Sequence, residues 1–476
     1  MYNINDILKV IDSWVWGPVL IVLILFVGIY FSFRLKFFQI KYLPTALKFM
    51  LKDEDGSSGE VSSFAALCTT LSATIGTGNI VGVATAISIG GPGALFWMCL
   101  AAFFGMATKY AEGLLSVKYR EIDKDNHVLG GAFYYIEKGM GKKFIWLAKM
   151  FAFFGAAVAL TGIGTFAQAN GIVGAISSIA DPEGVHKISI LGLNIPLVAL
   201  ISSLIISVLV ALILVGGIKR ISSISEVMVP FMAITYLLCC FIILISNITA
   251  IPEAFKEIFS YAFTGVAAVG GFAGAGVKDA IQKGVSRGIF SNEAGLGSST
   301  MATAAAKTKW PARQGLVSMV AVFIDTLLIC TLTGLSIIIS GAWKVEGLHG
   351  VEITAYAFQS GFSFAPWLGQ LLLVVCLVSF AFTTIIGWDY YGEQCLAYLL
   401  KDNKKAVSIY RWIYIVAVFI GGFLTVEVVW NISDIFNGLM ALPNLIALLA
   451  LSGVVVSESK KYFEYLKNEK KLKNNL

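Results

Sequence analysis

Charged residues are scarce in this 476-residue sequence: only 13% are Asp, Glu, Lys or Arg, against roughly 25% in soluble domains. Hydrophobic residues make up 57% of the chain, and the mean hydropathy is +0.81. This composition excludes an ordinary soluble domain. The apolar runs are about 20 residues long and do not alternate in ten-residue strands, so they predict an all-α polytopic membrane protein and not a β-barrel.

Residue patterns for metal, redox or hydrolytic chemistry are missing as well. The seven cysteines lie in apolar runs without a C-x-x-C pair, and the three histidines lie in connecting loops, so we expect core and solvated positions for them. No span carries an H-E-x-x-H pattern, which makes an intramembrane enzyme a remote alternative. A channel is another, because it needs a continuous lined pore. The sequence therefore predicts no enzyme and no cofactor.

Eleven apolar runs are long enough to cross a bilayer. They are 15–33, 64–88, 92–117, 146–177, 195–216, 227–247, 258–277, 314–341, 366–398, 410–426 and 432–456. Alternate connections hold 29 of the 35 Lys and Arg residues, and the opposite set holds 4. Because Lys and Arg are enriched in cytoplasmic connections, we expect a multi-pass cell-membrane protein with its N-terminus outside and its C-terminus in the cytoplasm. The net charge of +6 then reflects sidedness in the lipid bilayer and indicates no nucleic-acid partner.

The eleven runs also predict how the chain is divided. Setting the first run aside leaves ten, and a five-plus-five split makes the second half cross the membrane upside down relative to the first. The predicted parts are an extra N-terminal transmembrane helix with a basic cytoplasmic linker (1–62), the first five-helix repeat (63–248), the second, inverted five-helix repeat (249–457) and a Lys-rich cytoplasmic tail (458–476).

Two of the apolar runs contain unusually many small and polar residues. They hold "SATIGTGNIVG" (72–82) and "AFTGVAAVGGFAGAGV" (262–277), and each is the first run of its half. Glycine-interrupted segments at matching positions of two inverted halves indicate the binding site of a secondary transporter. A broken helix offers dipole ends and free carbonyls at mid-membrane, which suit a zwitterion and a sodium ion. The alternative is that these glycines only allow close packing between helices.

Several longer motifs resemble a known family. They are "WGPVLIVLILFVGIYFSFRLKFFQI" (16–40), "GGPGALFWMCLAAFFG" (90–105), "GGAFYYIEKG" (130–139), "FAQAN" (166–170), "FSNEAGLGSSTMATAAA" (290–306) and "FAFTTIIGWDYYGEQ" (380–394). Together they resemble the alanine or glycine:cation symporter family, also called the sodium:alanine symporter family. The sequence departs from that family at Cys99, where tryptophan is usual, and at Ala132, where proline is usual. The resemblance implies a LeuT-type 5+5 inverted repeat preceded by one extra helix, which imports alanine or glycine with sodium.

The same resemblance implies a substrate site made by three helices. The first broken helix would meet the substrate carboxylate, the third core helix would hydrogen-bond the substrate, and the second broken helix would cover it and accept its ammonium. In that order the residues are Thr77 and Gly78; Gln168; and Phe272 with the carbonyls of Gly270 and Gly271. Two alternatives stay open: Gln168 could form an interhelical bond, and Phe272 could serve packing.

Two sodium sites are implied as well. The side-chain oxygen of Asn79 would coordinate one ion close to the substrate carboxylate. The hydroxyls of Thr383 and Thr384 would hold a second ion, together with carbonyls near Ser72 and Ile75. The alternative for the two threonines is a bond back to carbonyls of their own helix.

One carboxylate, Asp325, lies about halfway through the run 314–341, with no Lys or Arg close to it in sequence. A charge in the middle of a membrane is costly and is therefore a functional candidate. Asp325 could ligate a sodium ion, carry a proton, or hydrogen-bond an unwound backbone while protonated. The sequence thus predicts a sodium-coupled symporter of a small neutral amino acid, with proton coupling through Asp325 as the alternative.

Overall fold

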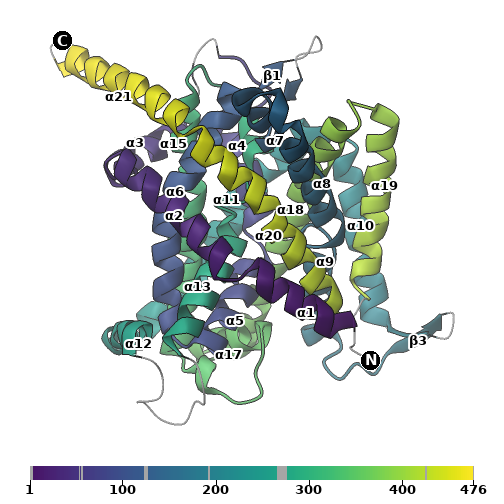
Figure 1. Ribbon diagram of the computed structural model, residues 1–476. Coiled ribbons are helices and arrows are strands. Elements are labelled where there is room, and N and C mark those ends of the chain that lie inside the picture. Colours follow the sequence, from purple (N-terminus) through teal and green to yellow (C-terminus); the bar gives the residue numbers. More distant parts are fainter. Residues whose placement is uncertain are drawn as a thin grey trace.

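The computed structural model describes residues 4–52, 54, 57–122, 127–190, 193–264, 276–423 and 426–474 (Figure 1). Its helices are α1 (Ile4–Val15), α2 (Pro18–Arg34), α3 (Phe38–Met50), α4 (Ser63–Thr74), α5 (Val81–Gly90), α6 (Gly93–Lys118), α7 (Ala132–Tyr134), α8 (Ile145–Thr161), α9 (Phe166–Ala180), α10 (Leu197–Leu214), α11 (Gly217–Ser246), α12 (Ile251–Thr264), α13 (Val277–Asn292), α14 (Thr300–Ala304), α15 (Pro311–Val322), α16 (Thr331–Ile339), α17 (Val351–Gly361), α18 (Pro366–Leu399), α19 (Lys404–Gly421), α20 (Val426–Ala450) and α21 (Ser452–Asn474).

Shorter elements complete the secondary structure of the described residues. Short 3₁₀ or π-helical segments lie at Thr77–Asn79, Tyr135–Gly139, Lys142–Phe144, Ile248–Ala250, Phe323–Cys330 and Ala342–Lys344. Two antiparallel hairpins lie in connections, β1 (Glu121–Ile122) with β2 (Val128–Leu129), and β3 (Lys187–Ile190) with β4 (Leu193–Pro196). The sequence analysis predicted neither hairpin, but both are peripheral and the bundle itself is helical, as expected.

Helices long and apolar enough to cross a membrane number eight among the described residues, or nine if one bent pair counts as a single span. They are Ile4–Arg34, Gly93–Lys118, Lys142–Ala180, Leu197–Leu214, Gly217–Ser246, Pro311–Ile339, Pro366–Leu399 and Asn431–Ala450, and the bent pair Ser63–Thr74 with Thr77–Gly90. An all-α polytopic membrane protein is therefore confirmed. Of the other two expected spans, 258–277 includes residues outside the described part, and 410–426 falls mainly on α19, which carries three cations.

The predicted interruption of the run 64–88 is confirmed. Helix α4 ends at Thr74, a 3₁₀ turn follows at Thr77–Asn79, and α5 begins at Val81 with its axis turned by 64°. The second predicted interruption, in 262–277, lies almost entirely on residues that the structure does not describe.

A further interruption was not predicted. The expected span 146–177 is present, but α8 ends at Thr161 and α9 begins at Phe166. The hydroxyl of Tyr414 on α19 lies 2.7 Å from the carbonyl oxygens of both Gly164 and Ile385, so it can donate to a carbonyl that the break leaves free. Hydropathy stays high across this break, which explains why the apolar pattern did not reveal it.

The long helix α6 is at the centre of the bundle and packs against α13, α15, α2 and α12. Close approach depends on small residues, as is common between helices in membranes. At Gly28 of α2, an added Cβ would lie 2.7 Å from the carbonyl oxygen of Phe104. The N-terminal helices α1 and α2 are thus fastened to the bundle, and the indole Nε1 of Trp16 donates to the carbonyl oxygen of Asp434 at 2.8 Å.

Candidate substrate and ion site

The interruption between α4 and α5 leaves backbone carbonyls without partners inside their own helix. Threonines from two distant helices lie against carbonyls on either side of it. The Thr384 hydroxyl of α18 lies 3.1 Å from the carbonyl oxygen of Ile75 and 3.0 Å from that of Phe380 in its own helix, so its single hydrogen has two acceptors. The Thr354 hydroxyl of α17 donates at 3.3 Å to the carbonyl oxygen of Ile80, which also accepts from an N–H inside α5. Both threonines are buried. Such bonds make an unwound backbone tolerable in the interior of a membrane protein.

Gln168 meets the same interruption from α9. Its side-chain Oε1 accepts a hydrogen bond from the backbone N–H of Thr77 at 3.2 Å. The intervening Gly76 is required by this arrangement, because an added Cβ would lie 2.6 Å from Thr384 Oγ1 and 3.2 Å from Gln168 Oε1. The Thr77 hydroxyl is buried and has no hydrogen-bond partner among the described residues. A buried hydroxyl without a hydrogen-bond partner lowers the stability of the fold. A ligand that accepts a hydrogen bond from it would recover that free energy, so the Thr77 hydroxyl is suited to binding one.

Asn79 connects the interruption to Asp325. Asn79 Oδ1 accepts from the N–H of Gly76 at 2.9 Å, and because a backbone N–H can only donate, this bond fixes which way the amide points. Asn79 Nδ2 then donates to Asp325 Oδ1 at 2.8 Å. The other oxygen, Oδ2, lies 2.8 Å from Ser291 Oγ and 2.7 Å from Thr326 Oγ1. Three neighbours thus hold the Asp325 carboxylate. Asp325 itself lies on the π-helical segment Phe323–Cys330, and π-helical segments are frequent at functional sites.

Two predicted ion-site residues have their side chains engaged elsewhere. The Thr383 hydroxyl donates to the carbonyl oxygen of Phe380 in its own helix at 2.9 Å and lies 3.5 Å from the sulfur of Met232. The Ser72 hydroxyl donates to the carbonyl oxygen of Thr69 at 2.8 Å, which does not bear on the ligand predicted there, because that ligand is a backbone carbonyl. In this structure, therefore, Thr384 reaches the interruption and the Thr383 hydroxyl does not.

Of the remaining predicted substrate residues, only Gly78 lies in the described part of the chain. Gly78 is buried, and an added Cβ would contact the ring of Phe290 at 3.3 Å, so α13 lies directly against the turn. Gly270, Gly271 and Phe272 lie outside the described residues. The described half of the site therefore consists of Thr77, Gly78, Gln168, Asn79, Asp325, Thr384 and the Ile75 carbonyl.

A second buried polar cluster was missed by the sequence analysis. Its signal is the pair Lys109 and Glu112, two charges three residues apart within the apolar run 92–117. Both are almost fully buried. The Lys109 ammonium donates to the carbonyl oxygens of Asn292 at 3.1 Å and Glu293 at 3.3 Å. A cation placed on the last carbonyls of α13 is favourable, because they form the negative end of the helix dipole.

Glu112 holds the segment that follows α13. Its Oε1 accepts from the N–H groups of Gly295 at 3.0 Å and Gly297 at 3.1 Å, and from Asn444 Nδ2 of α20 at 2.7 Å. Glu293, in the left-handed conformation with φ of 56°, accepts from Trp388 Nε1 at 3.0 Å. This cluster ties α6, α13, α18 and α20 together. Its partners are about 180 residues or more from Glu112, so no local pattern could have predicted them.

The described site offers mainly oxygen atoms as ligands for a cation. The described residues include no group of three or more His, Cys, Asp or Glu side chains that could hold a metal ion. The interruption instead presents carbonyl, hydroxyl and amide oxygens, with Asp325 as the single carboxylate next to it. Unwound backbone carbonyls of this kind coordinate sodium in secondary transporters.

Comparison with solved structures defines the class. The fold matches the crystal structure of MhsT in complex with L-phenylalanine with a TM-score of 0.52 and 12% sequence identity, covering 85% of this chain and 100% of that one. The protein is therefore a membrane protein with the LeuT-type transporter fold.

The chain belongs to the sodium:alanine symporter family, whose profile matches residues 1–475. It is 50% identical over 465 residues to an uncharacterized transporter of Haemophilus influenzae, covering 98% of this chain and 97% of that protein. It is 45% identical over 473 residues to the sodium/alanine symporter AgcS of Methanococcus maripaludis, covering 98% and 99%. The protein is thus a cation-coupled amino acid symporter and not an enzyme.

Proposed function

We propose that this protein imports alanine or glycine together with sodium ions across the cell membrane by alternating access. The observation that carries the proposal is the interrupted span α4–α5, where the unpartnered Thr77 hydroxyl lies beside Gln168 in a buried interior of the described bundle. Membership of the sodium:alanine symporter family supports both the solute and the ion. The proposal includes eleven spans, with an extra N-terminal helix before two inverted five-helix repeats.

The substrate would occupy the space next to the turn 77–79. Its carboxylate would accept from the Thr77 hydroxyl and the N–H of Gly78, with Gln168 fixing its orientation. Gly171 lets α9 approach the turn closely, because an added Cβ there would lie 2.7 Å from Thr77 Cγ2. On the other side, Phe272 would cover the amino acid, and the carbonyls of Gly270 and Gly271 would accept its ammonium, as the family resemblance implies.

Two cation sites would flank the substrate. One would use Asn79 Oδ1, which here accepts from Gly76, and the Asp325 carboxylate, which here faces Asn79 Nδ2. The Asn79 amide would therefore have to turn when sodium binds. The other would use the hydroxyls of Thr383 and Thr384 with the carbonyls of Ser72 and Ile75. At this second site the Thr384 hydroxyl already meets the Ile75 carbonyl. Thr383 would have to turn from its own helix when sodium binds.

Uptake into proteoliposomes tests this proposal. Labelled alanine and glycine are offered with a sodium gradient alone and with a proton gradient alone, and lysine serves as a charged control solute. We expect accumulation of alanine or glycine driven by sodium. Uptake that follows the proton gradient and ignores sodium would contradict the proposed coupling, and equal uptake of lysine would contradict the proposed solute class.

Proton coupling through Asp325 is the second candidate, and one observation favours it: this carboxylate is fully buried and lies on the hydrogen-bond chain that reaches the interruption. The Asp325→Asn variant separates the two. If Asp325 carries a proton, the variant loses proton-driven accumulation but still exchanges labelled for unlabelled solute. If Asp325 ligates sodium, the variant needs a higher sodium concentration for the same uptake.

A further inference from the structure

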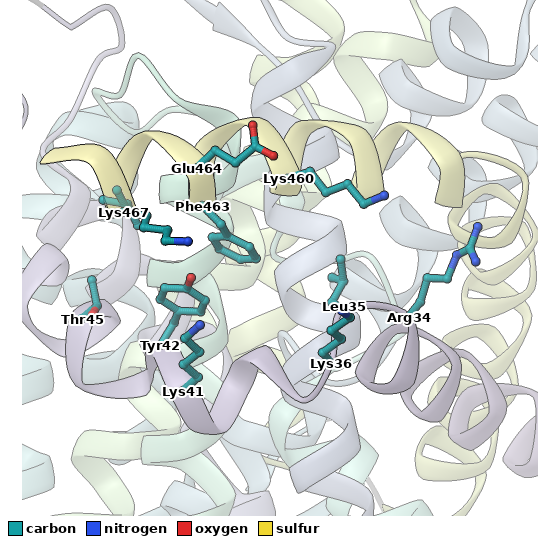
Figure 2. Close-up of a pocket in the computed structure, with 11 residues that line it drawn as sticks. Arg34, Leu35, Lys36, Lys41, Tyr42, Thr45, Lys460, Phe463, Glu464 and Lys467 are labelled. Carbon is teal, nitrogen blue, oxygen red and sulfur yellow. The ribbon is translucent and has the colours of Figure 1, made fainter. Parts of the chain in front are cut away.

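A basic cavity lies on the outside of the bundle, between α3 and the C-terminal helix α21 (Figure 2). Its volume is about 470 Å³. The lining residues are Arg34, Leu35, Lys36, Lys41, Tyr42, Thr45, Lys460, Phe463, Glu464, Leu466 and Lys467. The amino acid transport site does not use any of these residues.

The cavity lies where two candidate membrane-spanning helices end. The span that begins at Ile4 ends at Arg34, and α3 starts four residues later. The span Asn431–Ala450 is followed directly by α21. Both walls of the cavity therefore continue from membrane-spanning helices at the point where these leave the hydrocarbon. In Figure 1, α3 and α21 lie near each other at the same end of the molecule.

Positive charge dominates the cavity. Five of its lining residues are cationic (Arg34, Lys36, Lys41, Lys460 and Lys467), and one, Glu464, is acidic. Within the described part of the chain, none of the five forms an ion pair with a carboxylate. Figure 2 shows Glu464 on the side of α21 away from α3. Five like charges around one cavity repel one another, and a bound anion would remove that repulsion.

The cavity also has an aromatic wall that joins its two sides. The rings of Tyr42 on α3 and Phe463 on α21 are stacked, with centroids 4.3 Å apart and an interplanar angle of 12°. The ammonium of Lys41 lies 5.2 Å from the centroid of the Tyr42 ring. Figure 2 shows Lys467 and Phe463 directed from α21 toward Tyr42 and Lys41. Cations beside an apolar wall suit an anion that carries hydrocarbon.

We propose that this cavity binds the headgroup of an anionic phospholipid. The phosphate would lie between Lys41 and Lys467, and the glycerol and first acyl carbons would lie against Tyr42 and Phe463. A lipid is favoured over a soluble phosphate because the cavity opens where two spans meet the headgroup layer, and basic clusters next to a span attract anionic lipid. The bound lipid would link α3 to α21 and so fasten the tail to the membrane.

The test compares two double variants of equal charge in the purified full-length protein. Lys41→Gln with Lys467→Gln removes two cations from the cavity, one on each wall. Lys48→Gln with Lys461→Gln removes exposed cations of the same two helices that do not line it. Lys461 is paired with Glu458 of its own helix at 3.3 Å, and an exposed pair of this kind adds little stability. The measurement is the rise in unfolding temperature on titration with phosphatidylglycerol, with phosphatidylcholine and glycerol phosphate as separate titrants.

We expect phosphatidylglycerol to stabilise the wild type and phosphatidylcholine to have little effect. The cavity variant should need at least about tenfold more phosphatidylglycerol for the same stabilisation, since it loses two charge-assisted contacts to the phosphate. The control variant keeps those contacts and should need less than about twofold more. An equal loss in both variants would show general surface attraction and overturn the site. Equal stabilisation by glycerol phosphate would show a soluble anion instead of a lipid and would also overturn it.

Discussion

The amide of Asn79 has two partners that explain how the interrupted span stays ordered. Its oxygen accepts from Gly76 within the turn, and its nitrogen donates to the carboxylate of Asp325 on another helix. One side chain therefore both stabilises the turn and connects its geometry to a buried carboxylate. Single atoms matter at this scale, because a buried polar atom that loses its partner costs about 1–3 kcal/mol.

Gly76 provides the first prediction. In Gly76→Ala, the new methyl group would lie 2.6 Å from Thr384 Oγ1, so Thr384 and Gln168 must move away from the turn. We expect uptake to fall by at least about tenfold while the protein still inserts into the membrane, since a misplaced ligand group costs more than 1 kcal/mol. The control is Gly174→Ala on α9, where an added Cβ meets nothing within 4 Å, and it should retain near wild-type uptake. Full activity of Gly76→Ala would contradict the described geometry.

Thr384 provides the second prediction. Removing its hydroxyl in Thr384→Ala takes one oxygen from the proposed second sodium site, and a hydrogen bond or ligand to a charged group contributes about 1.5–3 kcal/mol. We expect the sodium concentration for half-maximal uptake to rise by about tenfold or more, with Thr384→Ser close to wild type. The matched control is Ser379→Ala, a hydroxyl on the outer side of the same helix that bonds its own backbone. Unchanged sodium dependence in Thr384→Ala would remove Thr384 from the ion site.

At the scale of elements, two of the interrupted spans in the described bundle, α4–α5 and α8–α9, meet through one bond. Gln168 lies in the first turn of α9, directly after the second interruption, and its Oε1 accepts from Thr77 in the first. The interruption at 162–165 therefore positions Gln168. Hydroxyls from α17, α18 or α19 bond to carbonyls at each break. A movement of these three helices would therefore change the geometry of both breaks.

Tyr414 tests the role of the α8–α9 interruption. Tyr414→Phe keeps the ring but removes the hydroxyl that lies 2.7 Å from the carbonyl oxygens of Gly164 and Ile385. We expect a loss of stability of about 1–3 kcal/mol, seen as a lower unfolding temperature, and reduced affinity for the solute because Gln168 shifts. Tyr356→Phe, on an exposed face of α17, should change neither quantity. Identical behaviour of the two variants would contradict a structural role of this break.

The sequence predicted the first of these interruptions and not the second, for physical reasons. The α4–α5 interruption was predictable because glycine, serine and threonine weaken a membrane helix and are concentrated in the stretch 72–82. The α8–α9 interruption was missed although the stretch 161–165 reads TGIGT, because high hydropathy continues on both sides of it. One of its stabilising hydroxyls, that of Tyr414, is 250 residues away. The Lys109–Glu112 pair left a visible signal, but its partners arise only from tertiary packing. Local patterns show where a helix is weak and do not show what replaces its lost bonds.

At the scale of the whole molecule, the distribution of Lys and Arg predicts sidedness. The hairpin β3–β4 and the tail α21 belong to opposite sets of connections, and Figure 1 shows them at opposite ends of the bundle. A LeuT-type fold places its solute site between these ends, at the interrupted helices. On the predicted sidedness, the basic cavity between α3 and α21 would face the leaflet that is richer in anionic lipid.

Cysteine labelling in intact cells tests this orientation. The seven native cysteines are buried or half-buried, so an introduced exposed cysteine is the preferred target of a membrane-impermeant maleimide. We expect Glu183→Cys, in the connection before β3, to react in intact cells. Asn468→Cys, at an exposed position of α21, should react only after the cells are opened. The reverse pattern would show that the whole bundle is inserted the other way.

The central claim is that the buried interruption between α4 and α5 binds the transported amino acid. The most direct measurement is calorimetric binding of alanine in sodium buffer to the wild type and to Thr77→Val, a variant of nearly equal size. Because the Thr77 hydroxyl has no partner among the described residues, its removal should not lower the unfolding temperature, yet the dissociation constant should rise about tenfold. An unchanged dissociation constant would contradict the claim.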